Sequence, residues 1–289
     1  MKVAIIGYGF VGKALENGFK ENVETILIDP KLNTEIFDLK LFNPNLIFIC
    51  VPTPMNNNGS QDISIIEKIF SEIIELQISG LIVLKSTVLP KNLSNIEKII
   101  PEIVYNPEFL REKFANEDFI NSPLIIFGGN DKSSRYLSDF YLKYTKCITS
   151  NHKFTDLISA SLIKYSINSF LATKVIFFNE LFKVFTKSNP NDTWENFIKI
   201  LMTDERIGSS HLQVPGPDGR LGFGGACFPK DTNALYSYSL DINEPFNILY
   251  DVIKINNEIR NSYDSLNARE KEQNINYDFN PRDIKEIKK

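Results

Sequence analysis

The sequence predicts an α/β protein in which a doubly wound parallel sheet is followed by a largely helical region. Short, continuously apolar runs such as KVAIIG and LIFICVP alternate with amphipathic stretches over the first 150 residues. This pattern is typical of parallel strands that are covered by helices on both faces. A glycine-rich turn follows the first run, and one long helical stretch extends from Thr155 to Lys187 after the alternation ends.

The composition predicts a globular, cytoplasmic protein. Hydrophobic residues make up 43% of the 289 residues and charged residues 24%, which is ample material for a core. A net charge of −4 does not suit nucleic acid or an acidic membrane surface as the main partner. MKVAIIGYGF is not followed by a signal-peptide cleavage site, and charges interrupt the most apolar long stretch, so no membrane span is expected. The three cysteines show neither a disulfide pattern nor a metal-binding pattern.

The first domain, residues 1–150, is expected to contain seven strands. Their sequences are KVAIIG, ETILID, LIFICVP, GLIVLKST, EIVYNP, PLIIFGG and KCITS. Residues 151–262 are expected to form a helical domain that begins with the long connecting helix. Residues 263–289 form a polar tail with few apolar anchors, which we expect to be loosely ordered.

The glycine-rich turn has the spacing of a dinucleotide-binding loop, which makes the predicted sheet Rossmann-like. Gly7 allows the turn, Gly9 lets a pyrophosphate approach the backbone, and Gly12 allows the helix to pack closely on the strand. The second strand ends at Asp29, whose carboxylate suits a ribose hydroxyl and would repel the 2′-phosphate of NADP. The loop therefore predicts NAD as cofactor, and the alternative is a strand–helix turn without a ligand.

A cysteine separates a glycine-rich loop from a predicted helix in GFGGACFPKD, residues 222–231. Pro229 suits the first position of a helix, because its missing N–H has no partner there in any case. Cys227 would then precede a helix N-terminus, where the positive end of the helix dipole favours a thiolate. The alternative is a small buried residue in a tight turn.

Three further clusters carry polar groups. YNPEFLRE predicts a helix that starts at its proline and carries Glu108 and Glu112 on one face. Lys164 and Asn168 are four residues apart in an apolar helix, where they could hold a developing oxyanion, although such a lysine more often extends to water. Thr87 follows the fourth strand, at the edge where open α/β sheets bind ligands.

Together and in this order, these stretches resemble the UDP-glucose/GDP-mannose dehydrogenase family. The resemblance covers residues 1 to about 260, and its matching stretches are IIGYGFVG, ICVPTP, KSTV, NPEFLRE, KYSINSFLATKVIFFNE, RIG and GFGGACFPKD. It implies an NAD-dependent oxidation of a nucleotide sugar at C6, from alcohol through aldehyde to acid, as in UDP-glucuronate formation for polysaccharide biosynthesis. It also implies a homodimer joined through the long helix.

The resemblance further implies roles for individual residues. Cys227 matches the nucleophile, and the other catalytic positions are Lys164 and Asn168 at the oxyanion, Asp231 in proton transfer, Glu108 in thioester hydrolysis and Thr87 in orienting water. The cofactor-binding positions are Gly7, Gly9, Val11, Gly12, Asp29, Thr53, Glu112 and Lys230. The substrate-binding positions are Phe109, Leu110, Arg206 and Gly224, with Arg206 reaching the neighbouring subunit's substrate. No metal is implied.

Two departures from the family pattern leave alternatives open. Family members usually continue into a third domain that holds the nucleotide, which we do not expect within these 289 residues. The VPGPDG segment before the glycine loop also looks longer than in many relatives. The alternatives are a UDP-N-acetylhexosamine or GDP-mannose dehydrogenase of the same mechanism, a simple two-electron dehydrogenase, and a non-catalytic NAD-binding assembly subunit.

Overall fold

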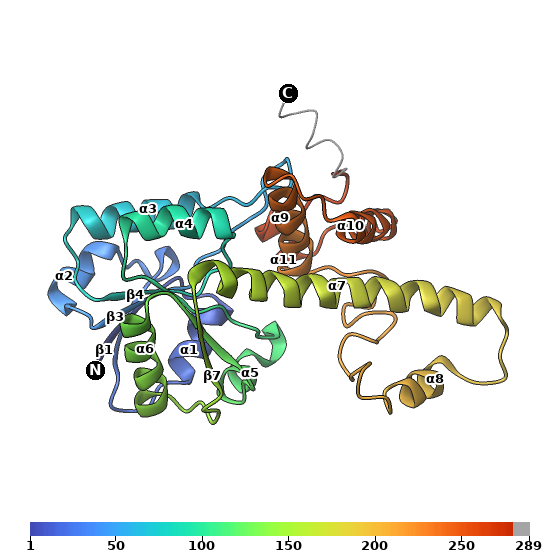
Figure 1. The fold of residues 1–289 in the computed structure, drawn as a ribbon, viewed down its shortest axis with the longest axis horizontal. Coiled ribbons are helices and arrows are strands. Elements are labelled where there is room, and N and C mark those ends of the chain that lie inside the picture. The colour runs from blue at the N-terminus through green and yellow to red at the C-terminus, as the bar shows by residue number, and fades with distance from the viewer. Residues whose placement is uncertain (280–289) are drawn as a thin grey trace. The chain divides into compact units, whose positions relative to one another are not determined.

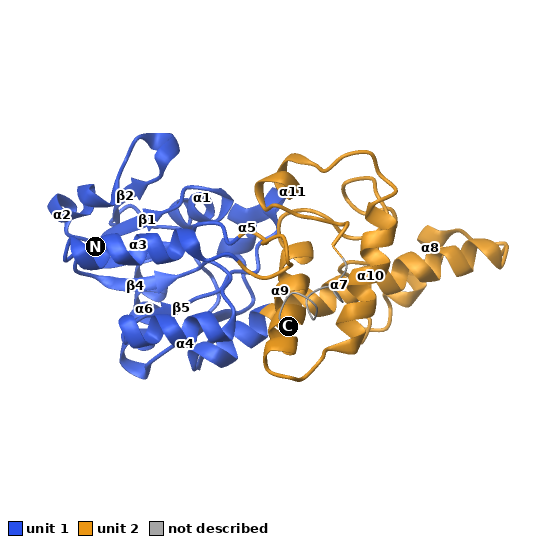
Figure 2. Ribbon diagram, turned by 90° about the horizontal axis from the view of Figure 1, so that it is seen from above, with its two compact units in different colours: residues 1–53, 62–164 blue, residues 54–61, 165–289 orange. Residues whose placement is uncertain are grey.

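The computed structural model describes residues 1–279, and the chain divides into two units, coloured separately in Figure 2. Unit 1 contains residues 1–53 and 62–164, and unit 2 contains residues 54–61 and the chain from residue 165 onward. Unit 1 therefore extends past the predicted boundary at residue 150. The short segment 54–61, which the sequence places in the first domain, belongs to unit 2.

Seven strands form one sheet in the described part of unit 1 (Figure 1). The strand order is β2-β1-β3-β4-β5-β6-β7, and all neighbours are parallel except β5 and β6. The strands are β1 (Lys2–Ile6), β2 (Glu24–Ile28), β3 (Leu46–Ile49), β4 (Leu81–Leu84), β5 (Val104–Tyr105), β6 (Ile125–Gly128) and β7 (His152–Thr155). The chain reverses its direction across the sheet between β1 and β3, which is where ligands bind in open α/β sheets.

Helices cover both faces of this sheet, as the uninterrupted apolar strands predict. Ala4 and Ile6 of β1 pack toward α3 and α4, while Val3 and Ile5 pack toward α1, α5 and α6. Figure 1 shows these two layers. The helices of unit 1 are α1 (Phe10–Asn17), α2 (Leu39–Phe42), α3 (Ser64–Glu75), α4 (Pro90–Ile99), α5 (Ala115–Ile120) and α6 (Asp131–Tyr144), with short 3₁₀ helices at Pro30–Leu32, Ile36–Asp38 and Glu112–Phe114.

The last strand does not lie where the sequence analysis places it. The stretch KCITS forms no strand, and β7 begins a few residues later with the sequence HKFT. This strand is at the edge of the sheet, and its residues are partly or fully exposed. This edge strand lacks the apolar run by which the other six strands are predicted.

Helices make up most of unit 2. The long helix α7 (Leu157–Lys187) matches the predicted helix closely and continues from unit 1 into unit 2. Trp194 anchors α8 (Trp194–Leu201) on the end of α7, with its ring centroid 5.1 Å from that of Phe182. The remaining helices are α9 (Phe228–Asp241), α10 (Asn247–Arg260) and α11 (Ala268–Glu272).

The expectation of a loosely ordered tail is wrong for residues 263–279. This segment contains α11 and buries Ile275, Tyr277 and Phe279, which are 4%, 6% and 8% exposed. The three apolar residues alternate with polar ones in NINYDFN, so only one face of the segment needs to be apolar. The predominantly polar composition hides this alternation. Residues 280–289 of the predicted tail lie outside the described residues.

A buried polar network lies at the carboxyl ends of β4 and β5. The Lys85 ammonium donates hydrogen bonds to Asn106 O (3.1 Å) and Asn106 Oδ1 (2.9 Å), and the Tyr141 hydroxyl donates to the same Oδ1 (2.6 Å). The Asn106 amide nitrogen donates to Ile126 O (2.8 Å). Lys85 and Asn106 are only 3% and 1% exposed, and burial lowers the pKa of Lys85 below its usual value.

Asn106→Ala is expected to destabilise the protein by about 1–3 kcal/mol or more, because it removes an acceptor from a buried ammonium. Since the folded-state pKa of Lys85 is lowered, the penalty for burying its charge is present at neutral pH and fades as the pH rises toward the pKa of an unfolded lysine. The variant's deficit should therefore narrow as the pH rises from neutral toward about 10.4, the pKa of an unfolded lysine. Urea unfolding at several pH values measures it.

The exposed Asn95 in α4 provides a matched control, and Asn95→Ala should leave the free energy of unfolding nearly unchanged. A deficit for Asn106→Ala that stays constant or widens with pH would contradict the role given to Lys85.

Candidate active site

The glycine loop joins β1 to α1, and its three glycines meet different surroundings. A Cβ on Gly7, which has φ +92°, would lie 2.8 Å from Cys50 O, and a Cβ on Gly12 would lie 2.3 Å from Gly7 O. A Cβ on Gly9 would have no described heavy atom within 4 Å, apart from those of Gly9 itself and its two chain neighbours. The loop is therefore tight at Gly7 and Gly12 and open at Gly9, as close approach of a pyrophosphate requires. The residues present fit a dinucleotide.

Asp29 at the end of β2 is held against this loop. Its Oδ2 accepts a hydrogen bond from Tyr8 N (2.8 Å), and its Oδ1 accepts one from Lys31 N (2.9 Å). The side chain is partly exposed, and each of its oxygens can accept a further hydrogen bond. Val11 lies in the first turn of α1, next to the glycines. The strand–loop–helix arrangement predicted from the sequence is present.

Two buried threonines connect the ends of neighbouring strands. Thr53 follows β3 and Thr87 follows β4, and the Thr53 hydroxyl donates to Thr87 O at 3.0 Å. Ser86 makes a second connection by donating to Val51 O at 2.7 Å. These loops lie at the carboxyl edge of the sheet, as the sequence predicts.

Lys164 and Glu108 form a buried pair in unit 1. The Lys164 ammonium donates to Glu108 O (2.5 Å), lies 3.4 Å from Glu108 Oε1, and is 5.2 Å from the Phe109 ring centroid. Lys164 is 2% exposed and Glu108 9%. The lysine therefore does not extend to water, which was the alternative for a lysine in an apolar helix.

The helix predicted for YNPEFLRE is absent. Residues 106–111 are irregular, and a 3₁₀ turn begins only at Glu112. The Asn106 side chain is used in the buried network rather than as a helix cap, and Glu108 Oε2 accepts from Leu110 N at 2.6 Å, which bends the segment. Glu108 and Glu112 therefore do not share a helix face: Glu108 is buried, whereas Glu112 is exposed.

Cys227 lies directly before α9 in unit 2, as predicted. It is the N-cap residue of this helix, it is partly exposed, and its carbonyl accepts from Asp231 N at 2.9 Å. The helix begins at Phe228, one residue before the proline that marks its start in the sequence analysis. Cys50 differs from Cys227, because burial raises the pKa of Cys50 to about 12 and keeps it a neutral thiol.

Asp231 is the centre of a second buried cluster. Its Oδ2 accepts from the Asn168 amide and its Oδ1 from the Lys230 ammonium, each at 2.6 Å. Asp231 is 1% exposed. Asn168 lies one turn after Lys164 on α7, so these two donors, which the sequence pairs by their spacing, each hold a carboxylate.

The predicted substrate-binding residues differ in their surroundings. Phe109 and Leu110 follow Glu108 in the chain and are partly buried. Gly224 packs against Arg260, whose Nη2 would lie 2.2 Å from a Cβ at this position. Arg206, beyond α8, is exposed and bound to Asp204, with 2.9 Å between Arg206 Nε and Asp204 Oδ1.

Sequence reasoning missed the residues that support these groups. Lys85 stands inside the matched stretch KSTV, and its signal was a lysine at the end of an otherwise apolar strand. Arg260 and Glu270 lie near or beyond the end of the matched stretches, and no spacing connects them to the glycine loop. Within residues 1–279, no helix is long and apolar enough to cross a membrane, and no group of three or more His, Cys, Asp or Glu residues is arranged to hold a metal ion.

Curated proteins are similar to this chain in sequence. UDP-glucose 6-dehydrogenase of Rickettsia bellii is 38% identical over 235 residues, which cover 78% of this chain and 52% of the relative. UDP-glucose 6-dehydrogenase YwqF of Bacillus subtilis is 32% identical over 259 residues, covering 86% of this chain and 56% of the relative. The chain therefore spans about half the length of the curated relatives it matches.

Solved structures and family profiles agree with these relatives. The UDP-glucose dehydrogenase structure from Pyrobaculum islandicum has a TM-score of 0.75 and 26% identity, covering 89% of this chain and 68% of that one. Residues 13–145 match the profile of the NAD binding domain, and residues 158–258 match that of the central domain, of the UDP-glucose/GDP-mannose dehydrogenase family. With both profiles matched in order over most of its length, the chain belongs to the UDP-glucose/GDP-mannose dehydrogenase family.

Proposed function

We propose that this chain carries out the NAD-dependent oxidation of a nucleotide sugar, from the C6 alcohol to the carboxylic acid, with UDP-glucose as the first substrate to test. The observation that carries this proposal is the position of Cys227. It lies at the start of α9, one turn before the buried Asp231 that Asn168 and Lys230 hold. The curated relatives named above are UDP-glucose 6-dehydrogenases, which supports this substrate.

Cys227 supplies the nucleophile for the second oxidation. Its thiolate adds to the aldehyde carbon, a C–S bond forms, and the carbonyl electron pair becomes an alkoxide. Loss of hydride then gives a thioester, and attack by water breaks the C–S bond with its electron pair returning to sulfur. Overall, one alcohol, two NAD and one water give one carboxylate, two NADH and three protons. NAD, when bound, supplies the hydride acceptor.

The buried polar residues suit the charges that develop in these steps. The Lys164 ammonium and the Asn168 amide are hydrogen-bond donors held in a water-poor surrounding, which is the kind of group that stabilises an oxyanion. Asp231 accepts protons, Glu108 activates the water that cleaves the thioester, and Thr87 orients it. Phe109, Leu110 and Gly224 contact the sugar.

The cofactor is held by the glycine loop and the strand ends. The pyrophosphate would approach the backbone at the open Gly9, next to Val11, while Gly7 makes the turn and Gly12 lets α1 pack on the strand. Thr53, Glu112 and Lys230 complete the contacts. Asp29 accepts hydrogen bonds from the adenosine ribose, because its partly exposed carboxylate is already oriented by Tyr8 N and Lys31 N.

Cys227→Ser is expected to reduce acid formation by about a thousandfold or more, because a serine hydroxyl is far less nucleophilic than a thiol at neutral pH. NADH release with UDP-glucose, together with mass analysis of the product, measures this loss. Cys147→Ser provides the control, because Cys147 lies in unit 1 with its Sγ donating to Phe119 O, and this variant should keep its activity. Acid formation by Cys227→Ser at the wild-type rate would rule out the nucleophile.

The same assay separates the substrates. UDP-glucose, UDP-N-acetylhexosamines and GDP-mannose differ in base and in the sugar's C2 substituent, and NADH counted per sugar identifies the oxidised one. A protein that binds NADH but oxidises none of them would fit the assembly-subunit alternative.

NADH is expected to bind about tenfold or more tightly than NADPH, because the Asp29 carboxylate would repel a 2′-phosphate. Fluorescence titration of the protein with each reduced cofactor measures the two dissociation constants without any sugar. Asp29→Asn keeps an acceptor for Tyr8 N but removes the charge, so it should narrow the difference. Equal binding of both cofactors by the wild type would contradict this role of Asp29.

The partner that fits the exposed face of α7 is a second copy of the chain. Phe170, Phe177 and Val184 recur every seven residues and are 69%, 60% and 60% exposed. A seven-residue apolar repeat is the pattern by which helices pair, and a single helix face can pair with its own copy about a twofold axis. In such a homodimer Arg206 reaches the substrate of the other subunit.

Phe177→Glu is expected to convert the homodimer into monomers at micromolar concentration, because a carboxylate would be buried in an apolar seam. Light scattering measures the mass in solution. Thr186→Glu is the matched control. Thr186 is exposed and lies on the opposite side of the same helix from Phe177, so the substitution adds the same charge outside the apolar seam. A wild-type monomer, or a Phe177→Glu dimer, would contradict the interface.

A further inference from the structure

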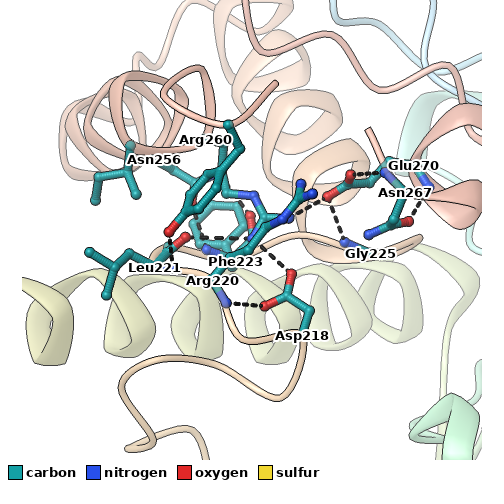
Figure 3. Close-up of polar contacts among 12 residues, drawn as sticks. Asp218, Arg220, Leu221, Phe223, Gly225, Asn256, Arg260, Asn267 and Glu270 are labelled. Carbon is teal, nitrogen blue, oxygen red and sulfur yellow. Dashed lines mark hydrogen bonds and ion pairs between the residues drawn. The ribbon is translucent and has the colours of Figure 1, made fainter. Parts of the chain in front are cut away.

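The loop that leads to Cys227 is held through its backbone by side chains from other parts of unit 2. Four of its five residues, from 221 to 225, donate a backbone N–H to a side-chain oxygen. These bonds are Leu221 N to Tyr263 Oη (2.8 Å), Gly222 N to Asn179 Oδ1 (2.9 Å), Phe223 N to Asn256 Oδ1 (2.7 Å) and Gly225 N to Glu270 Oε1 (3.3 Å). Figure 3 shows several of these contacts.

Glu270, which accepts from Gly225 N, the held backbone group nearest to Cys227, belongs to a buried ion pair. Arg260 Nη2 donates to Glu270 Oε1 at 2.7 Å, and the Tyr277 hydroxyl donates to the same oxygen at 2.8 Å. Asn267 N donates to Glu270 Oε2 at 2.8 Å, which closes a capping box at the start of α11. The Arg260 and Glu270 side chains are 1% and 0% exposed, and Arg260 Nη1 also donates to Asp218 Oδ2 at 2.8 Å.

Glu270 is ionised in this surrounding. Burial by itself raises the pKa of its carboxyl, but the hydrogen bonds from Asn267 N and the Tyr277 hydroxyl and the Arg260 charge outweigh it and hold the pKa below its usual value. An ionised acceptor makes a stronger hydrogen bond to a backbone N–H than a neutral one does.

Gly224 lies between the held residues Phe223 and Gly225 and is in contact with the same Arg260–Glu270 ion pair. A Cβ on Gly224 would lie 2.2 Å from Arg260 Nη2 and 2.4 Å from Glu270 Oε1. The ion pair therefore packs directly on the backbone of Gly224, as well as accepting from Gly225 N. The loop is fixed from one side by contacts that only glycine permits.

We propose that Glu270, supported by Arg260, is a positioning residue for Cys227, and that it acts by fixing Gly224 and Gly225 two and three residues ahead of the thiol. This inference rests on the proposed function of Cys227 and deepens it. A nucleophile displaced by about 1 Å can lose as much as a hundredfold in rate. The positioning effect should therefore appear in the second oxidation, which uses the thiol, and not in cofactor binding.

Two double variants test the proposal, because removing Glu270 alone would leave the Arg260 charge buried without its partner. Arg260→Met with Glu270→Gln keeps an oxygen that can accept from Gly225 N. Arg260→Met with Glu270→Met lacks this oxygen but has the same net charge and nearly the same volume. The two proteins therefore differ mainly in the acceptor.

The first readout is hydrogen exchange of the 221–227 backbone, followed by mass spectrometry. The methionine–methionine protein should exchange about tenfold or more faster there than the methionine–glutamine protein. The second readout is kinetic. The methionine–methionine protein should lose about tenfold or more in kcat for acid formation, with an unchanged KM for NAD, while the methionine–glutamine protein stays close to wild type.

Equal loop exchange in the two double variants would overturn the proposal, as would an equal kcat for acid formation in both. If the wild type oxidises no nucleotide sugar, the proposed function fails, and the exchange comparison still decides whether Glu270 fixes the loop. Should the double variants not fold, Asn267→Ala removes one side-chain cap beside Glu270 without removing a charge. This variant should also speed hydrogen exchange of the 221–227 backbone and lower kcat for acid formation. If both stayed at their wild-type values, the proposal would again be overturned.

Discussion

Buried charges must be paired, and this constraint organises the polar groups around the candidate site. An ion left alone in a protein interior costs several kcal/mol, so a buried pair whose partners lie on different elements holds those elements together. The pairs are Lys164 with Glu108, Lys230 with Asp231, and Arg260 with Glu270. In unit 1 such a pair ties the segment after β5 to α7, and in unit 2 another ties α11 to α10. Lys164 and Glu108 are 56 residues apart, so this pair joins elements that are distant in sequence, whereas Arg260 and Glu270 are 10 residues apart and Lys230 and Asp231 are neighbours on α9.

The sequence was sufficient to predict those parts of the fold whose burial is uniform. Strands such as Leu46–Ile49 are buried on both faces, so each appears as a continuous apolar run that needs no partner to be recognised. The edge strand His152–Thr155 and the segment 263–279 were not predicted correctly, because each is apolar on one side at most. Their structure is decided by what packs against them, and a single sequence does not contain that information in any local pattern.

The residues of the candidate site likewise differ in whether a local sequence pattern predicts their position. Gly7, Gly9 and Gly12 were predicted because backbone geometry imposes their spacing, and Cys227 because its helix start is local. The helix expected at Glu108 failed because Asn106, a good cap by residue type, makes its hydrogen bonds with Lys85 and Tyr141 instead. Glu270 lies 45 residues from Gly225, and only the folded chain shows that the two meet.

Segment 54–61 has a consequence for the modularity of the chain. Because it belongs to unit 2, where Met55 N donates to Gln273 O, the chain passes from one unit to the other after residues 53, 61 and 164. Neither unit is a single continuous stretch. A fragment cut at the end of unit 1, after residue 164, would keep residues 54–61 but lose Gln273, to which Met55 is hydrogen-bonded. A single recombination event that exchanged one unit for a homologous one would likewise separate Met55 from Gln273. The eight-residue segment 54–61 therefore links the two units along the chain, although it contains no residue of the glycine loop and none of the proposed site residues.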